Sequence, residues 1–112
     1  MVDFQNAVSI IVAAIAERKK VNLHFYSKED QSIQQRTCAP LDVGPSRRAK
    51  IQNDRFHFWD YDSDQKPHVL SINPEQMVKI EALEEIFQPE TIVNWDTRKS
   101  PWFVKRDWGS VS

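Results

Sequence analysis

The sequence predicts a mainly β protein, with one N-terminal helix followed by five short strands in a small, strongly bent antiparallel sheet or barrel. Three observations support this fold class. A stretch free of Gly and Pro, residues 4–19, opens the chain with apolar residues at helical spacing. Segments of alternating or aromatic residues follow, and polar turn residues separate them. The length of 112 residues, with 40% hydrophobic and 28% charged residues, fits a single soluble domain.

The N-terminal helix has a clear start and one apolar stripe. Asp3 is the expected N-cap, and Phe4, Val8, Ile11 and Ile15 recur at helical spacing. We expect this stripe to pack on the sheet, and the alternative is that it binds a partner.

The first two strands are predicted to form a hairpin. Alternation in Val21–Tyr26 places His24 and Tyr26 on the face opposite the apolar residues. A polar turn follows, and Ile33–Leu41 should return beside the first strand. Because Pro40 has no N–H, this strand is expected to pair only near an end or an edge of the sheet.

The strongest strand signal is the aromatic-rich stretch Ile51–Tyr61, which predicts a long central strand after a loop at residues 42–48. A turn leads into a shorter returning strand, His68–Ile72. Pro74 opens one helical turn, and Val78–Ala82 alternates as the last strand. The expected core includes Phe25, Phe56 or Phe58, and Ile80.

Charge and cysteine content limit the class of protein. The net charge of −1 and a pI of about 6.3 argue against strong non-specific adhesion to nucleic acid or anionic membrane, so a nucleic-acid site must be a local patch. Cys38 stands alone, which excludes an internal disulfide, and it occupies an apolar strand position expected in the core. Residues 1–5 lack a basic leader, and the apolar run at 8–16 is too short to cross a bilayer. The sequence predicts a cytoplasmic protein with no membrane partner.

The C-terminal stretch Gln88–Ser112 differs from residues 1–87 and is expected to be an extension of that domain. It mixes aromatic residues with cations: Trp95, Trp102, Phe103 and Trp108 among Arg98, Lys99, Lys105 and Arg106. Three indoles are costly to leave in water, so we expect the extension to fold back on the barrel or to pair with another subunit. Stacking of these aromatics on nucleic-acid bases is the alternative.

Four segments in order carry a resemblance to the WYL-domain family: AIAERKKVNLHFYS, QQRTCAPLDV, RFHFWDYD and VLSINPEQMVKIEALEEIF. The resemblance spans about residues 6–87. It implies an Sm-like, SH3-type barrel of about five strands that senses an anionic ligand, often single-stranded nucleic acid or a nucleotide, and regulates another process. The namesake tripeptide is replaced here by Phe56-His57-Phe58, and the strand at 68–71 lacks the arginines that the family carries there. Since a helix-turn-helix does not fit in the chain, a stand-alone WYL-type domain is expected.

The predicted ligand site is a basic and aromatic face. Cations fix phosphates while aromatic rings stack bases. The predicted ligand-binding residues are His24, Tyr26, Arg36, Arg47, Arg48, Lys50 and His57. Tyr26 and Arg36 also match positions of the WYL family. The alternatives are a solvated loop at 47–50 and a surface ion pair between Arg36 and Glu29 or Asp30.

Catalysis, cofactors and metal binding are not expected. The three histidines and the acidic run at Asp60–Asp64 have no metal-ligand spacing, and no Ser or Cys lies in a nucleophile context. Two functions of different classes remain. One is a regulatory module that binds single-stranded nucleic acid or a nucleotide. The other is an interaction module that docks a protein partner or a second copy, as a homodimer, through Trp95, Trp102 and Trp108.

Overall fold

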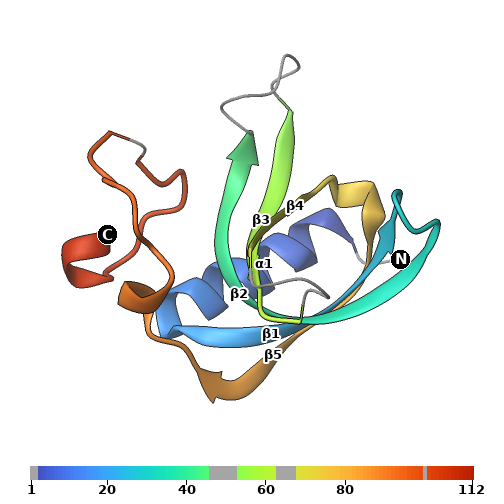
Figure 1. Cartoon of the computed structure of the whole chain (residues 1–112), viewed down its shortest axis with the longest axis horizontal. Helices are drawn as coiled ribbons and strands as arrows, with labels where there is room; N and C mark the ends of the chain where they lie inside the picture. Colours follow the sequence, from blue (N-terminus) through green and yellow to red (C-terminus); the bar gives the residue numbers. More distant parts are fainter. Residues whose placement is uncertain (1–2, 46–52, 63–67, 100) are drawn as a thin grey trace.

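One helix lies over a bent sheet of five antiparallel strands, as the sequence predicts (Figure 1). The computed structural model describes residues 3–45, 53–62, 68–99 and 101–112. The elements in chain order are helix α1 (Phe4–Glu17), strands β1 (Lys19–Ser27), β2 (Ser32–Pro45), β3 (Asp54–Asp60) and β4 (His68–Ile72), 3₁₀ helix η1 (Pro74–Gln76), strand β5 (Met77–Ile86), and 3₁₀ helices η2 (Pro89–Thr91) and η3 (Gly109–Val111).

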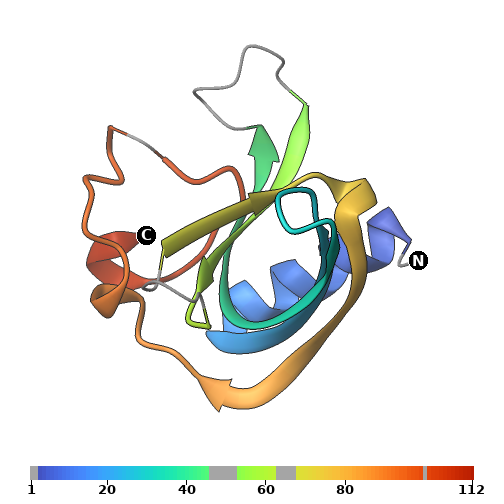
Figure 2. The ribbon, with the colours of Figure 1, turned by 45° about the vertical axis from the view of Figure 1, so that its right-hand side comes forward.

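The strand order is β4-β3-β2-β1-β5, with every neighbouring pair antiparallel. The sheet curves around α1, which packs against β1, β2 and β5 (Figure 2). The sheet nevertheless stays open, so the barrel that the resemblance implied is not closed: β4 and β5 are the two edges and do not pair with each other within the described chain. The short 3₁₀ helix η1 connects these two edge strands in the chain. The Gln76 side chain accepts from Asn73 N at 2.9 Å and donates to Tyr26 O at 2.9 Å, which ties η1 to the end of β1.

Helix α1 starts where predicted and ends earlier than predicted. The Asp3 carboxylate accepts from Asn6 N at 3.3 Å, as expected of an N-cap. Arg18 adopts a left-handed conformation, with φ of 58°, and its N–H bonds to the Ala14 and Ile15 carbonyls. This turn ends the helix, and Lys19 therefore begins β1 instead of continuing α1.

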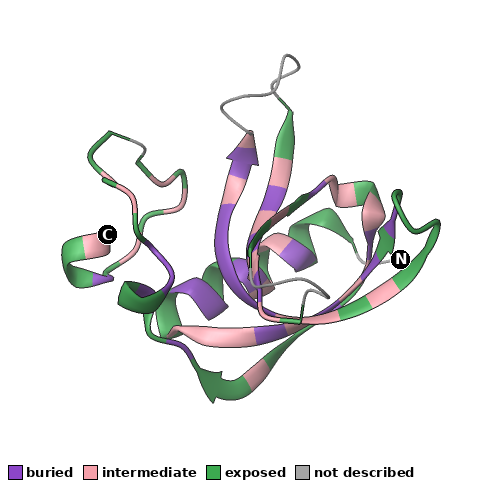
Figure 3. Ribbon diagram, viewed as in Figure 1, coloured by how far each residue is buried: buried purple, intermediate pink, exposed green. Residues whose placement is uncertain are grey.

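The core lies between α1 and the face of the sheet that α1 covers, which we call the inner face (Figure 3). The predicted core residues are buried: Phe25, Phe56, Phe58 and Ile80. Cys38 is also fully buried, as its apolar strand position predicted. From the helix, the core receives Ala7, Ile11, Ala14 and Ile15.

The prediction for Pro40 is wrong, because β2 is the central strand of the sheet and Pro40 lies in its middle. The register between β2 and β3 shifts between Pro40 and Asp42, which is a bulge that accommodates the missing N–H. Beyond the bulge the strand continues to Pro45 through residues that the sequence predicted as loop. The bulge also moves Asp42 to the outer face, opposite His57, while Val43 lies opposite the buried Phe56.

None of the helices formed by the described residues has the length and apolar character needed to cross a membrane.

Candidate functional site

The structure does not gather the predicted ligand residues on one face. In the β1–β2 hairpin, His24 lies opposite Gln35, whereas Arg36 lies opposite the buried Leu23. Directly opposed residues share a face of the sheet, and successive residues alternate between faces. His24 and Tyr26 are therefore on the outer face and Arg36 is on the inner face. The predicted single site is wrong on this point.

His57 is also separated from His24 and Tyr26, although it shares the outer face. It lies opposite Asp42 of β2, seven positions beyond Gln35, the partner of His24. Seven residues of strand span about 23 Å along the chain. His57 thus belongs to a different end of the sheet from His24. The remaining predicted residues, Arg47, Arg48 and Lys50, lie outside the described residues, in the connection between β2 and β3.

Arg36 is held by the chain that follows β3. Its Nη1 donates to Asp62 O at 2.6 Å, and its Nε lies 4.0 Å from Asp60 Oδ2. The Asp62 carboxylate in turn accepts from Thr37 N at 2.7 Å. Arg36 thus contacts Asp60 and Asp62, and not the Glu29 or Asp30 of the alternative ion pair, and it has a structural role in fixing the end of β3.

The carboxylates of Asp60 and Asp62 also affect the pKa of Cys38, which lies opposite Asp60 in the sheet. Burial raises the pKa of the Cys38 thiol, the carboxylates of Asp60 and Asp62 raise this pKa further, and Arg36 opposes the shift. The thiol is therefore kept protonated and unreactive at neutral pH.

His24 belongs to a network of polar side chains on the outer face. Its Nε2 is 3.3 Å from Asn22 Nδ2, and Gln35 Nε2 donates to Asn22 Oδ1 at 3.1 Å. Tyr26, 42% exposed, lies opposite Ile33, which is 60% exposed. This surface is open but carries few cations, and its side chains mainly bond to one another.

His57 of β3 lies near the connection between β2 and β3, and its ring contacts both β2 and β4. Its Nε2 is 2.8 Å from the Gly44 carbonyl of β2, and its Nδ1 is 2.7 Å from Ser71 Oγ of β4. A carbonyl only accepts, so Nε2 carries the proton, and Nδ1 is left to accept from the Ser71 hydroxyl when the ring is neutral. Arg55 lies opposite Gly44 on the same outer face as His57. Its Nε is buried and has no hydrogen-bond partner among the described residues.

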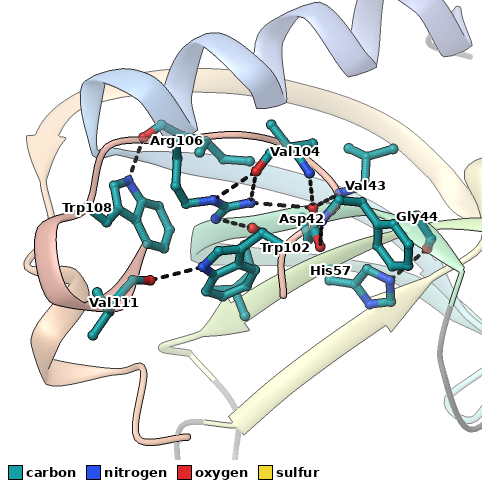
Figure 4. A network of polar contacts seen from close by, with 12 residues as sticks. Asp42, Val43, Gly44, His57, Trp102, Val104, Arg106, Trp108 and Val111 are labelled. Atoms are coloured by element: carbon teal, nitrogen blue, oxygen red, sulfur yellow. Dashed lines mark hydrogen bonds and ion pairs between the residues drawn. The ribbon is translucent and has the colours of Figure 1, made fainter. Parts of the chain in front are cut away.

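The C-terminal extension docks beside this hairpin through Asp42 (Figure 4). Phe103 N and Val104 N donate to the two oxygens of the Asp42 carboxylate, each at 2.9 Å. Arg106 Nη2 lies 3.4 Å from the same carboxylate, and Arg106 also donates to the carbonyls of Leu41 and Val104. The pair is buried, with the Arg106 side chain 0% exposed and that of Asp42 9% exposed.

Two tryptophans enclose the Arg106 guanidinium. Its carbon lies 3.9 Å from the centre of the Trp102 ring and 4.4 Å from the Trp108 ring. Burial lowers the pKa of Arg106 to about 10, against the opposing effect of Asp42, and the group stays charged at neutral pH. Trp108 is fully buried and donates to Ile15 O at 2.9 Å, while Trp95 packs edge-on against Trp102. The predicted partner-binding tryptophans thus make contacts within their own chain.

Sequence reasoning missed Asp42, Gly44, Phe103 and Arg106 as a connected group. One signal was available, because Gly44 is one of only two glycines in the chain. The pairing of Asp42 with Arg106 joins residues 64 positions apart and had no local signature. As for metal ligands, the described residues hold no group of three or more His, Cys, Asp or Glu side chains placed around a common point.

The arrangement defines a small module in which one helix covers an open, bent, five-stranded antiparallel sheet and a structured extension completes the surface. No protein-family model matches the chain, and no curated protein matches it. Among solved structures, the fold is similar to part of proteasome accessory factor B/C (PafBC) of Arthrobacter aurescens, with a TM-score of 0.57 and 16% identity. The match covers 84% of this chain and 14% of that chain. At this level of sequence identity, the match shows a likeness of fold alone.

Proposed function

We propose that the chain is a non-catalytic regulatory module that binds single-stranded nucleic acid or a nucleotide at the connected end of the β2–β3 hairpin, where β2 leads into β3. We call this region the hairpin-end site; it comprises Arg55 and His57 together with Arg47, Arg48 and Lys50 of the connection. The observation that carries the proposal is the placement of Arg55 and His57 on one face of the sheet. Arg47, Arg48 and Lys50 precede Arg55 by eight residues or fewer in the chain and lie outside the described residues. Phosphate oxygens bind such clusters of cations.

Two further observations support an anionic ligand here. The buried Nε of Arg55 lacks a hydrogen-bond partner among the described residues. An unpaired buried donor costs about 1–3 kcal/mol, and an acceptor oxygen supplied by a ligand would offset this cost. The similarity in fold to part of PafBC, a regulatory protein, together with the WYL resemblance, favours ligand sensing over catalysis. His24, Tyr26 and Arg36 are left out of the proposed site because the sheet separates them from it.

The test is fluorescence anisotropy with short labelled DNA and RNA strands at two salt concentrations. Affinity should fall with added salt, with a slope of about −0.7 per phosphate contact. Arg47→Ala/Arg48→Ala should weaken binding of all sequences and flatten that slope by about one to two units. The matched control is Arg98→Ala/Lys99→Ala, which removes the same charge from exposed positions of the extension.

A third variant separates the proposed site from the outer face of β1. Tyr26→Ala should leave affinity unchanged, because Tyr26 of β1 lies opposite Ile33, at the other end of β2 from the connection. A loss of affinity in Tyr26→Ala, with none in Arg47→Ala/Arg48→Ala, would move the site to β1. Absence of binding at low salt would reject the nucleic-acid proposal and favour the protein-interaction function.

A further inference from the structure

Strand β5 forms one edge of the sheet. It pairs with β1 along one side, and no described strand pairs with its other side. Figure 1 shows β5 at the margin of the sheet. The N–H and C=O groups along the outer side of an edge strand can pair with a strand of another chain. The outer side of β5 is therefore a candidate interaction surface.

The central part of β5 is regular. Residues 79–82 pair one-to-one with residues 21–24 of β1, and the register shifts on both sides of this stretch. A bulge bends a strand and leaves a residue unpaired, so an added strand pairs best along the regular part. These four residues thus limit where a partner strand can form a ladder with β5.

Two exposed side chains of opposite charge lie on this regular stretch. Lys79 lies opposite His24 on the outer face of the sheet, and Glu81, two residues further along the strand, shares that face. The Lys79 and Glu81 side chains are 58% and 52% exposed, and Lys79 Nζ is 3.6 Å from Glu81 Oε1. Ile80, between them, is buried in the core. The edge therefore presents one cation and one anion on the same face.

These charges select one register for the pairing of β5 with the β5 of a second copy. A two-fold axis normal to the sheet keeps each face continuous, so opposed residues share a face. An axis at Lys79 would oppose two lysines, and an axis at Glu81 would oppose two glutamates. An axis at Ala82 would carry the pairing into residues 83–85, beyond the regular stretch. An axis at Ile80 would place Lys79 of each copy opposite Glu81 of the other, and directly opposed opposite charges stabilise a strand pair.

We propose that the outer side of β5 is a self-association surface, at which two copies of the chain pair their β5 strands antiparallel around Ile80. The two sheets then join into one continuous sheet. Self-pairing is favoured over pairing with an unrelated strand because the two-fold axis forms two ion pairs from one Lys79 and one Glu81 per copy. The surface is separate from the tryptophans of the extension, which contact their own chain. The inference does not depend on the proposed function.

Sedimentation velocity over a range of concentrations tests the association, and charge variants test the register. The unmodified protein should show a monomer–dimer equilibrium. Lys79→Glu and Glu81→Lys each place like charges at both opposed positions, so each variant alone should raise the dimer dissociation constant by about tenfold or more. An equimolar mixture of the two variants restores opposite charges at both positions. The mixture should form heterodimers with an affinity close to that of the unmodified protein.

Two control variants make the same charge changes at exposed positions outside β5. Lys105→Glu matches Lys79→Glu, and Glu90→Lys matches Glu81→Lys. Both controls should leave the dissociation constant unchanged. All four variants should fold, because each replaced side chain belongs to an exposed residue.

Cysteine cross-linking locates the register independently. A mixture of Lys79→Cys and Glu81→Cys should form an intermolecular disulfide, because directly opposed Cβ atoms lie about 4.5–5.5 Å apart. The reciprocal pair, Glu81 of one copy with Lys79 of the other, stays intact in this mixture. Lys79→Cys alone should cross-link less, since its two copies are diagonal neighbours about 7–8 Å apart. Cys38 is buried with a protonated thiol and does not compete.

Three results would overturn the proposal. The first is a single monomeric species at every concentration up to about 1 mM. The second is a dimer that neither charge variant weakens, which would place the association on another surface. The third is a loss of the dimer in both variants that mixing does not restore, which would show that the pairing is not centred on Ile80.

Discussion

The sheet–helix unit, residues 4–87, and the C-terminal extension, residues 88–112, both bury aromatic side chains, and they do so by different means. The unit follows an apolar pattern: Phe56 and Phe58 alternate along β3 and are 1% and 0% exposed. The described residues of the extension form no strand, and their regular elements are the short helices η2 and η3. In the extension, the buried ring of Trp108 packs against the charged guanidinium of Arg106, which pairs with the Asp42 carboxylate of the sheet. Regular secondary structure thus organises one region and a buried ion pair organises the other.

The difference follows from the needs of the backbone. In a sheet, neighbouring strands satisfy the N–H and C=O groups, so apolar side chains can fill the core without polar partners. Irregular chain that packs on a protein must find acceptors elsewhere. Here the Asp42 carboxylate accepts from two consecutive amides of the extension, at Phe103 and Val104. We therefore expect perturbations of the unit to be global and perturbations of the extension to be local.

The largest effect is expected from Phe58→Ala in the unit. Phe58 is completely buried, and truncating a buried phenylalanine costs about 3–5 kcal/mol. Urea denaturation followed by far-ultraviolet circular dichroism should show this loss as one cooperative transition. A loss below about 1 kcal/mol would contradict the assignment of β3 to the core.

A smaller and local effect is expected from Arg106→Met in the extension. The change removes the charged hydrogen bonds to Asp42, worth about 1.5–3 kcal/mol, while Asp42 keeps its backbone donors and methionine keeps apolar contact with the indoles. Hydrogen exchange should increase at residues 102–108 and stay unchanged in β1 and β2. Equal acceleration in all three segments would show that the extension and the sheet unfold as one unit.

The third effect is a pH dependence of the free energy of unfolding, which arises from the buried thiol of Cys38. The ordinary pKa of cysteine, 9.0, applies in the unfolded chain, while burial raises the pKa of Cys38 in the folded state. The folded state then binds more protons above pH 9, so the stabilising contribution is complete below pH 9 and is lost as the pH rises. The loss for one such group is about 1.4 kcal/mol between pH 8 and pH 10.

Urea denaturation at these two pH values, for the unmodified protein and Cys38→Ala, tests this effect. The alanine variant should lose less stability on going to pH 10. Tyr61, whose pKa burial also raises, contributes a decline in both proteins, and this decline is smaller in the variant because Cys38 helps to raise the pKa of Tyr61. Identical declines in the two proteins would show that Cys38 does not titrate differently on unfolding.

The smallest effect is expected from Arg98→Ala, within the extension but away from the Asp42 contacts. Arg98 forms an ion pair with Asp96, and its side chain is 91% exposed. Water screens such pairs, so the melting temperature should not change measurably. Scanning calorimetry of this variant beside Arg106→Met would show whether the buried cation alone stabilises the docked extension. A clear drop in Arg98→Ala would extend the docking surface to residues 96–98.

The sequence by itself determined the elements and the core. The helical spacing of Ile11 and Ile15 and the cap at Asp3 located α1, because these signals act within a few residues. Alternation in β1 and β3 identified the buried faces, because a strand with one face in a core requires it. Strands β1 to β4 pair in the order in which they follow one another in the chain, whereas β5 pairs with β1 at the other edge of the sheet, which no turn signal indicated.

The tertiary structure alone decided which of the candidate residues lie on the same face of the sheet. The register of β1 and β2 places Leu23, and not His24, opposite Arg36, and a slip of one residue would have reversed this. The bulge after Pro40 turned Asp42 toward the extension, and its partner Arg106 lies 64 residues away. Local sequence does not encode a register or a distant ion pair, since both depend on how the whole sheet is packed. The docking of the extension on β2, through Asp42 and Gly44, is therefore a property of the tertiary structure alone.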